Sequence, residues 1–154
     1  MTAPRRRIRS RARKRSTPKR KKPFERSKAP RATSADVQLL PGKERRIGDL
    51  GAVRQYWRVF FKGVQAGRAF IVAQKPDRKD PDASITVELN QKSRGRGIGS
   101  IAFRKASELS GYPQVYASMR KGNIASQIAA TRAGFVPLAE EASNELVLVW
   151  RRPK

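Results

Sequence analysis

Seven consecutive residues carry the most specific chemical signal in the chain: Arg94-Gly95-Arg96-Gly97-Ile98-Gly99-Ser100. They follow an alternating apolar run at 85–89 and open a helical pattern over 98–109. The first N–H groups of a helix have no partner inside it and carry partial positive charge, so they attract anions. The glycines leave the backbone open to a ligand, and Arg94 and Arg96 add formal charge. We therefore predict that this stretch binds a pyrophosphate group.

The composition excludes several kinds of catalysis. The chain has no cysteine and no histidine, so a thiolate nucleophile, an imidazole base and the triads built on them are ruled out. No two of the 12 acidic residues sit at a spacing typical of a metal site, so we expect no bound metal. No apolar run reaches the roughly 20 residues of a membrane span, and no apolar signal segment follows the basic start. The sequence predicts a cytoplasmic location.

Positive charge is concentrated at the N-terminus. The chain has 36 Lys and Arg against 12 Asp and Glu, a net charge of +24. Residues 1–33 hold 15 of the basic residues, four prolines and one acid, Glu25. Such a segment cannot bury enough apolar surface to offset the entropy lost on ordering. We predict a disordered basic tail over 1–33, able to bind polyanions without sequence preference, and one folded domain over 34–154.

The pattern of apolar residues predicts an α/β domain. Residues 37–40 form a short predicted strand, whereas Ile47, Leu50, Val53 and Trp57 recur at a helical spacing. Further predicted strands and helices follow: strands at 57–62, 68–73, 85–89, 115–119, 135–138 and 146–150, a turn at 63–67, and helices at 98–109 and 123–134. The predicted fold is a mixed central β-sheet with helices on both faces, in the order β-β-β-α-β-α-β-β. Strand 85–89 should run parallel to strand 115–119.

Two familiar phosphate-binding motifs fit the glycine stretch poorly. A Walker loop needs Gly-Lys-Ser/Thr at a fixed spacing, and none follows. A dinucleotide-binding fold fits better, because Gly97, Gly99 and Ala102 match G-x-G-x-x-A after a predicted strand. That motif also needs an acid roughly 20 residues further on to bind the ribose. No acid occurs between Glu108 and Glu140.

A third pattern fits over a longer stretch. Residues 94–99 match R-x-x-G-x-G, and Asn123, Ser126, Gly134 and Phe135 follow at matching intervals. In this the chain resembles the GNAT superfamily of N-acetyltransferases over about residues 57–150. The resemblance implies an enzyme that transfers an acetyl group from acetyl-CoA, its co-substrate, to an amine. It also implies a GNAT-like core truncated at its N-terminal side.

The resemblance assigns residues to the cofactor. The strand that ends at Leu89 should hold a bulge and splay from strand 115–119, so that pantetheine lies along Leu89 and Asn90 and the pyrophosphate lies on residues 94–100. Asn123, with Ser126 nearby, should contact the pantetheine end. The complete cofactor-binding set is Leu89, Asn90, Arg94, Gly95, Arg96, Gly97, Ile98, Gly99, Ser100, Asn123 and Ser126.

The catalytic residues depart from the family pattern. Many members place a tyrosine seven residues after the Asn, as general acid, where this chain has Ala130. Some carry a glutamate where it has Ser118. Transfer to an amine needs a base that removes a proton from the ammonium. The remaining candidates are Glu88 on the central strand and Tyr116 and Ser118 on its neighbour, or else an ordered water.

The acceptor and the role of the tail are left open. The stretch 34–56 is shorter than in the family, which suits an open acceptor site and a macromolecular amine, on a protein or on a nucleic-acid-bearing target such as a ribosome or tRNA. The alternative is a catalytically weakened GNAT-like binding module whose basic tail binds nucleic acid. In a third hypothesis the tail serves to package a phage or a chromosome. In the simplest hypothesis it only keeps the protein soluble.

The charge of residues 1–33 leads to a testable prediction. If the tail contacts about six to ten phosphates, log affinity for duplex DNA should fall against log salt with a slope of roughly −5 to −9. Deletion of residues 1–33 should flatten this slope sharply in a filter-binding or anisotropy titration. An unchanged slope after deletion would assign the phosphate contacts to the folded domain.

Overall fold

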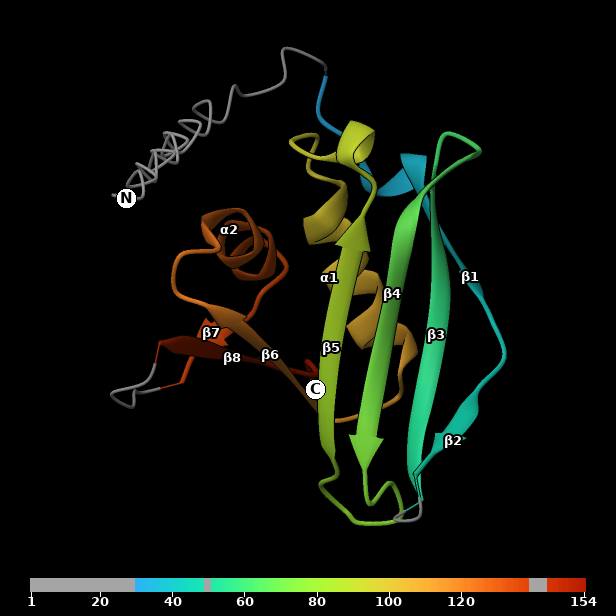
Figure 1. Ribbon diagram of the computed structural model, residues 1–154, viewed down its shortest axis with the longest axis vertical. Coiled ribbons are helices and arrows are strands. Elements are labelled where there is room, and N and C mark those ends of the chain that lie inside the picture. The colour runs from blue at the N-terminus through green and yellow to red at the C-terminus, as the bar shows by residue number, and fades with distance from the viewer. Residues whose placement is uncertain (1–29, 49–50, 139–143) are drawn as a thin grey trace, which may run out of the picture.

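The computed structural model describes residues 30–48, 51–138 and 144–154. Most of the predicted tail, Leu50 and the acidic pair Glu140-Glu141 lie outside these ranges. Within them the chain forms eight strands, two α-helices and two short 3-10 helices (Figure 1). The elements are, in chain order, η1 Ser34–Asp36, β1 Val37–Pro41, β2 Arg45–Ile47, β3 Ala52–Phe61, β4 Val64–Gln74, β5 Asp82–Leu89, η2 Gln91–Ser93, α1 Ile98–Leu109, β6 Gln114–Arg120, α2 Ile124–Arg132, β7 Val136–Pro137 and β8 Glu145–Arg151.

All eight strands belong to one sheet. Its order is β1-β3-β4-β5-β6-β8-β7, and β2 pairs with β3 at the edge. The pairing of β5 with β6 is parallel, and every other pairing is antiparallel. The predicted mixed sheet and the parallel step around α1 are therefore confirmed.

The hairpin of β3 and β4 is tighter than predicted. Phe61 pairs with Val64, so the turn contains only Lys62 and Gly63. Both have positive φ, 47° and 80°, as a two-residue hairpin with the twist of its strands requires. The predicted five-residue turn at 63–67 is wrong, because residues 64–67 already belong to β4. Because β4 has one more residue than β3 over this stretch, the register of the two strands shifts between Val59 and Phe60.

The predicted helical stripe at 47–57 is also wrong. Ile47 ends β2, whereas Val53 and Trp57 belong to β3, and Arg46 of β2 pairs with Val53. A spacing of three and four residues suggested one helix, but a reversal of the chain separates the two strands. Tertiary pairing with β4 along the whole of β3 overrides that weak local pattern. The predicted strand at 37–40 is confirmed as β1.

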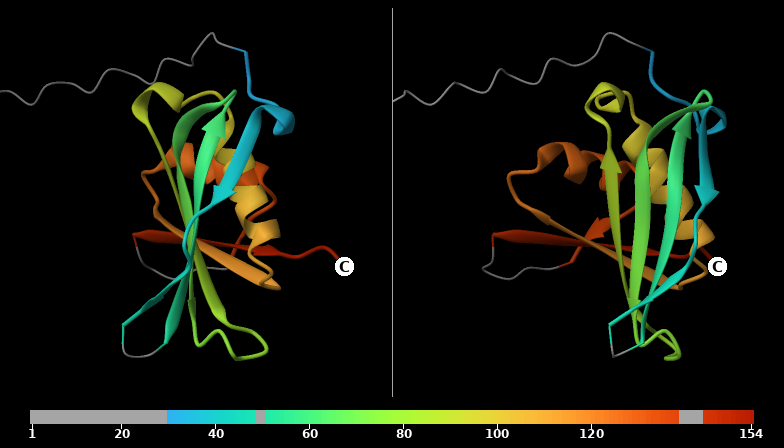
Figure 2. Two further views of the ribbon diagram at one scale, coloured as in Figure 1. Left: turned by 90° about the vertical axis from the view of Figure 1, so that its right-hand side faces the viewer. Right: turned by 45° about the vertical axis from the view of Figure 1, so that its right-hand side comes forward.

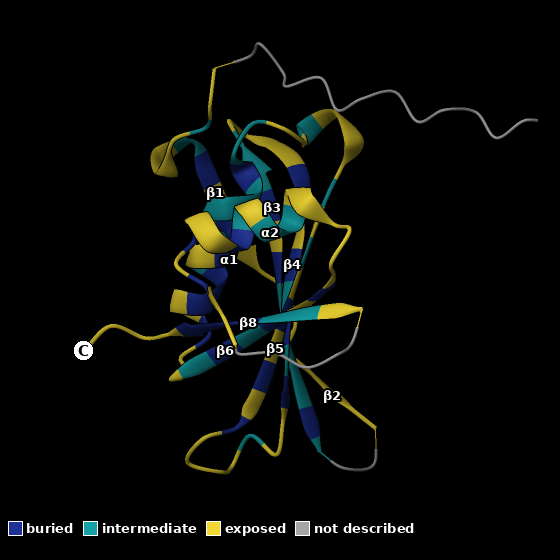
Figure 3. Cartoon of the chain, turned by 90° about the vertical axis from the view of Figure 1, so that its left-hand side faces the viewer, coloured by how far each residue is buried: buried dark blue, intermediate teal, exposed yellow. Residues whose placement is uncertain are grey.

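One helix covers the first part of the sheet. α1 packs along one face of β1, β3, β4 and β5, whereas α2 packs on α1 and on β6 (Figure 2). Figure 3 shows buried residues on α1 and along the strands of the sheet. Phe103 of α1 meets Phe135, after α2, edge to face, with ring centroids 5.6 Å apart. Because both rings are at least 94% buried, they tie the two helices to one core.

The aromatic contact allows a test of the core. Replacement of Phe135, which is 1% exposed, by alanine should lower the free energy of unfolding by about 3–5 kcal/mol, since it removes apolar contacts and leaves a cavity. Val64→Ala, at a side chain 71% exposed, should change it by about 0.5 kcal/mol or less. Urea unfolding measures both. Similar losses in the two variants would contradict this location of the core.

Candidate functional site

The site is built on a divergence of two parallel strands. The register of β5 with β6 contains a single pair, Ser84 with Tyr116. In Figure 1 the two strands separate from there toward their carboxyl ends, so the predicted splay is confirmed. The predicted bulge in β5 is wrong, because β5 pairs with β4 without a break from Asp82 to Leu89. The register shift lies instead in the neighbouring β3–β4 pair.

The glycine stretch starts α1 as the sequence predicts. Ile98 is the first helical residue, and Gly97 precedes it in the left-handed region, with φ 82° and ψ 1°. A Cβ built on Gly97 meets no described atom within 4 Å, so the space in front of the first helical turn is open. Ser100 Oγ donates to the Gly97 carbonyl oxygen at 3.1 Å and keeps this turn tight. The first N–H groups of α1 therefore face a space that can hold an anion.

Gly99 has a different role from Gly97. A Cβ on Gly99 would lie 3.4 Å from the Ala129 Cβ and 3.6 Å from Leu89 Cδ1. The residue therefore lets α1 approach both α2 and the end of β5. This close approach brings the start of α1 to the mouth of the opening between β5 and β6.

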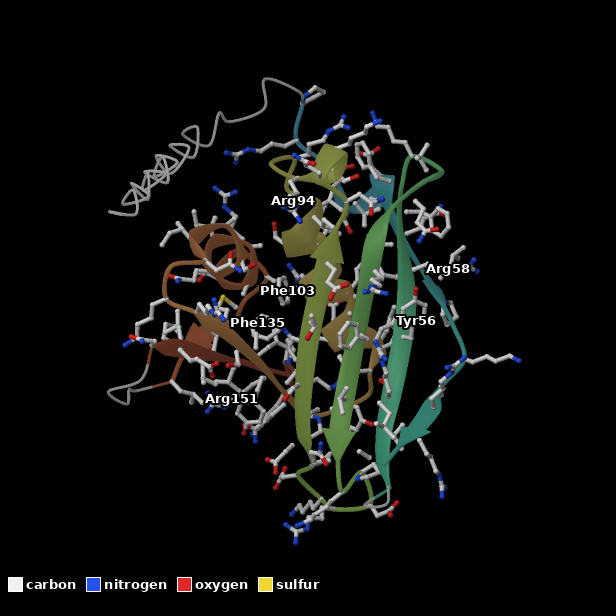
Figure 4. All side chains as sticks on the ribbon, viewed as in Figure 1. Tyr56, Arg58, Arg94, Phe103, Phe135 and Arg151 are labelled. Carbon is white, nitrogen blue, oxygen red and sulfur yellow. The ribbon has the colours of Figure 1, made fainter. Side chains whose placement is uncertain are left out.

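The two arginines of the motif point to different partners. Arg94 Nε donates to the Leu89 carbonyl oxygen at 3.2 Å, so this side chain lies across the end of β5. The Arg96 guanidinium stacks 4.6 Å from the Phe61 ring centre, and its Nε is buried. Arg94 therefore lies beside the opening, while Arg96 serves mainly to pack the loop against β3. Figure 4 shows Arg94 near the upper end of β5.

A pocket of about 580 Å³ adjoins the start of α1. Most of its lining residues are polar or positively charged: Arg31, Ala32, Ser34, Gly97, Ser100, Ile101, Arg104, Lys105, Glu108 and Arg132. Arg104 is paired with Glu108 at 3.0 Å. The sequence analysis did not identify Arg31, Arg104 or Arg132. Gly97, Ile101 and Arg104 are spaced so that they share one face of α1, and this spacing could have predicted that Arg104 lies near the glycine stretch. Arg31 and Arg132 are brought to the pocket by tertiary packing.

The segment that carries Arg31 is fixed to the domain. The N–H of Ala32 donates to the Arg96 carbonyl oxygen at 2.8 Å. Lys105 Nζ donates to the carbonyl oxygens of Ser34 and Val37, at 2.7 and 2.6 Å. Thr33 donates to the Asp36 carboxylate from its N–H and its hydroxyl, and these bonds lower the pKa of Asp36. Contacts of the domain thus begin before residue 34, where the composition placed its boundary.

The remaining predicted cofactor residues lie around the opening. Asn123 caps α2 by accepting the N–H of Ser126 at Oδ1, at 3.3 Å. Asn90 is turned toward β4, where its N–H donates to the Ala66 carbonyl and its side chain to the Gln65 carbonyl. Asn123 and Ser126 thus stand together at the start of α2, whereas the donors of Asn90 are already used within the sheet.

The three predicted catalytic residues share one face of the sheet, opposite the face that α1 covers. Ser84 pairs with Tyr116, and alternation places Glu88 and Ser118 on the same side. Glu88 is bound to Arg68 Nε at 2.5 Å. Ser118 Oγ donates to Glu145 Oε2 at 3.1 Å. The sequence analysis missed Glu145, whose place opposite Arg120 depends on the pairing of β6 with β8.

Ala130 occupies the position where the family pattern has a tyrosine, and its side chain has no group that could donate a proton. Its side chain is fully buried, and its carbonyl accepts the N–H groups of Ala133 and Phe135. A tyrosine at this position would need room that the closely packed core does not have.

Within the described segments no helix is long and apolar enough to cross a membrane. In the same residues no group of three or more acidic side chains is placed so that it could hold a metal ion.

Comparison with solved structures identifies the fold. MccE, a microcin self-immunity acetyltransferase in complex with acetyl-CoA and AMP, matches with a TM-score of 0.53 and 18% identity, over 64% of this chain and 61% of MccE. RimL, a ribosomal-protein alpha-N-acetyltransferase in complex with coenzyme A, matches with a TM-score of 0.53 and 19% identity, over 64% and 62%. A GNAT-family acetyltransferase from Streptococcus pneumoniae gives 0.52 and 19%, over 64% and 66%. The chain has the fold of the GNAT acetyltransferases.

The chain is similar to these proteins in its three-dimensional structure and not in its sequence. No protein-family model matches the sequence, and no curated protein matches it significantly. The chain spans about three fifths of the length of MccE and of RimL.

Proposed function

We propose that the chain is an acetyl-CoA-dependent N-acetyltransferase, which transfers an acetyl group to an amine. The observation that carries the proposal is the start of α1, where Gly97 leaves open space in front of free backbone N–H groups. It lies at the mouth of the opening between β5 and β6, in a GNAT fold. A side chain at Gly97 would occupy this space, so the residues present fit a bound pyrophosphate.

The described residues suit the different parts of acetyl-CoA. The pyrophosphate would lie on the amides of the first turn of α1, and Arg31 and Arg132 in the adjoining pocket would supply positive charge. The backbone of Leu89 would hold the pantetheine at the edge of β5. Asn123 and Ser126 would contact its far end. When bound, acetyl-CoA supplies the activated acetyl group.

Removal of a proton from the acceptor ammonium requires a base near the opening. Two carboxylates flank it, Glu88 on β5 and Glu145 on β8, beside Ser118 of β6. Glu88 forms an ion pair with Arg68 of β4. We assign the base to the Ser118–Glu145 pair, because Ser118 Oγ already donates to Glu145 Oε2 and can pass a proton along that bond. Tyr116, on the same face, would orient the acceptor.

The acceptor we propose is a macromolecular amine, on a protein or on a nucleic-acid-associated target. No α-helix precedes β3 in the described segment 30–48, so that segment provides no helical wall over the acceptor side. The net charge of +24 favours targets that carry negative charge. RimL, one of the solved structures with this fold, is a ribosomal-protein alpha-N-acetyltransferase, and a ribosomal protein is a target of this kind.

The alternative is a GNAT-like binding module with weakened catalysis. The full burial of Ala130 in place of a tyrosine favours it. The open Gly97 favours the enzyme. Release of CoA thiol in the presence of an amine separates the two, because a binding module would hold acetyl-CoA, or only nucleic acid, without turnover.

The cofactor assignment predicts a charge effect at Gly97. Gly97→Asn and Gly97→Asp have nearly the same shape, and both residues tolerate positive φ. Asp places a negative charge where the pyrophosphate should lie. Acetyl-CoA at about 100 times its dissociation constant should stabilise the wild type by roughly 2.7 kcal/mol. The Asn variant should keep much of this gain and the Asp variant should lose most of it, as measured by thermal unfolding with and without acetyl-CoA.

The Asn variant is the control for backbone strain. If the wild-type melting temperature does not move in saturating acetyl-CoA, the cofactor assignment is wrong. If Asn and Asp lose the gain equally, shape at Gly97 and not charge determines binding.

The catalytic assignment predicts a difference between the two carboxylates. Glu145→Gln should lower kcat by about 10²–10⁴-fold, the usual contribution of a general base. Ser118→Ala should also lower kcat. Glu88→Gln should have a smaller effect, because the proposed path of the proton runs through Ser118 and Glu145. CoA thiol release with a panel of N-terminal peptides and small amines measures the rates. A larger loss for Glu88→Gln than for Glu145→Gln would reverse the assignment.

A further inference from the structure

The sheet has a second surface, which we call the outer face, opposite the side that α1 covers. Neither α1 nor α2 packs on the outer face of β3 and β4. Strand register and alternation place six large side chains there: Arg54, Tyr56, Arg58, Phe60, Arg68 and Phe70. Figure 4 shows Tyr56 and Arg58 on β3, on the side turned toward the viewer, with α1 behind the strands.

Three of these six residues are aromatic. Tyr56 and Phe70 are direct cross-strand partners, and Phe60 lies further along β3. All three are half-buried, and none belongs to the core or to the residues packed against it. The segment after β1 lies against the Tyr56 ring at Gly42, and neither α1 nor α2 packs on Phe60 or Phe70. Aromatic rings on adjacent strands are the type of surface on which nucleic-acid bases stack.

Arginines alternate with the rings. The Arg54 guanidinium lies 4.2 Å from the Phe70 ring centre, and Arg58 lies 6.0 Å from that of Phe60. Arg58 pairs directly with Arg68, and Arg54 with Arg45 of β2. Like charges directly opposite each other destabilise a sheet. Glu88 of β5 offsets the charge of Arg68, so the excess positive charge of this surface lies on Arg45, Arg54 and Arg58 and favours a partner that brings negative charge.

The charge of the chain limits what can cover the outer face. A second copy would carry the same net charge of +24, and residues 1–33 hold 15 cations against one acid. Both would be repelled by the arginines. The partner must be anionic and must also offer flat apolar groups to three rings.

We propose that the outer face binds single-stranded nucleic acid. Bases stack on Tyr56, Phe60 and Phe70, and Arg54, Arg58 and Arg68 contact the phosphates and the base planes. An acidic protein segment would satisfy the arginines but leave the rings without planar partners. The inference goes beyond acetyl transfer and does not depend on it. Of the six residues only Arg68 touches a residue of the proposed active site, through its ion pair with Glu88, and the variants below leave Arg68 unchanged.

The test uses the full chain and a fluorescein-labelled 12-nucleotide oligo-uridine, with binding measured by anisotropy at several salt concentrations. A duplex of equal length reports sequence-blind phosphate contacts, including those of the basic tail. The double variant Phe60→Leu/Phe70→Leu keeps apolar volume but removes two rings. Phe60→Tyr/Phe70→Tyr, which keeps both rings, is its matched control.

The single strand should bind the wild type more tightly than the duplex. The Leu variant should lose affinity for the single strand by about 5- to 150-fold per ring, from the usual strength of base stacking, and should keep its affinity for the duplex. The Tyr variant should bind like the wild type. Equal single-strand binding by the Leu variant and the wild type, with both folded by thermal unfolding, overturns the proposal.

A charge variant gives a second test that does not disturb the rings. Arg58→Gln should reduce the salt slope for the single strand by about 0.7, the value for one phosphate contact on a single strand. Arg78→Gln, at an exposed position between β4 and β5, should leave it unchanged. If polyglutamate binds as tightly as oligo-uridine and loses affinity in the same variants, the partner is an acidic protein and the proposal is wrong.

Discussion

The separation of β5 from β6 is the constraint on which the rest of the site depends. The two parallel strands share one registered pair, Ser84 with Tyr116, and then diverge. Backbone groups at the end of β5 therefore have no ladder partner on that side, and the Leu89 carbonyl accepts Arg94 instead. An opening of this kind inside a sheet is stable only if other elements close one side of it. α1 and α2 do so by packing on each other.

The packing of the two helices explains the choice of small residues near the opening. Gly99 lies close to Ala129 and Leu89, so a larger side chain would push α1 away from α2 and β5. Gly97 has a separate task, since its positive φ turns the chain into the helix and its missing side chain leaves the helix N-terminus accessible. Two glycines two residues apart thus combine close packing with an exposed anion-binding turn.

The sequence predicted the elements around the motif better than the side chains that complete the site. The helix 98–109 and the cap at Asn123 were predictable because both depend on local rules. The region 45–57 was not, because strand pairing overrides a weak helical spacing there. Glu145, Arg31 and Arg132 were also beyond reach, since only tertiary pairing brings them to Ser118 and to the start of α1.

The proposed acetyl-CoA site depends on binding of the pyrophosphate by the first turn of α1. Amide NMR spectra of the full chain can be recorded during titration with acetyl-CoA and, in parallel, with acetyl-pantetheine, which lacks the pyrophosphate. If the first turn binds the pyrophosphate, acetyl-CoA should shift the amide signals of Gly97, Gly99 and Ser100 strongly, and acetyl-pantetheine should leave them nearly unchanged. If saturating acetyl-CoA leaves these three signals in place, the pyrophosphate does not bind there.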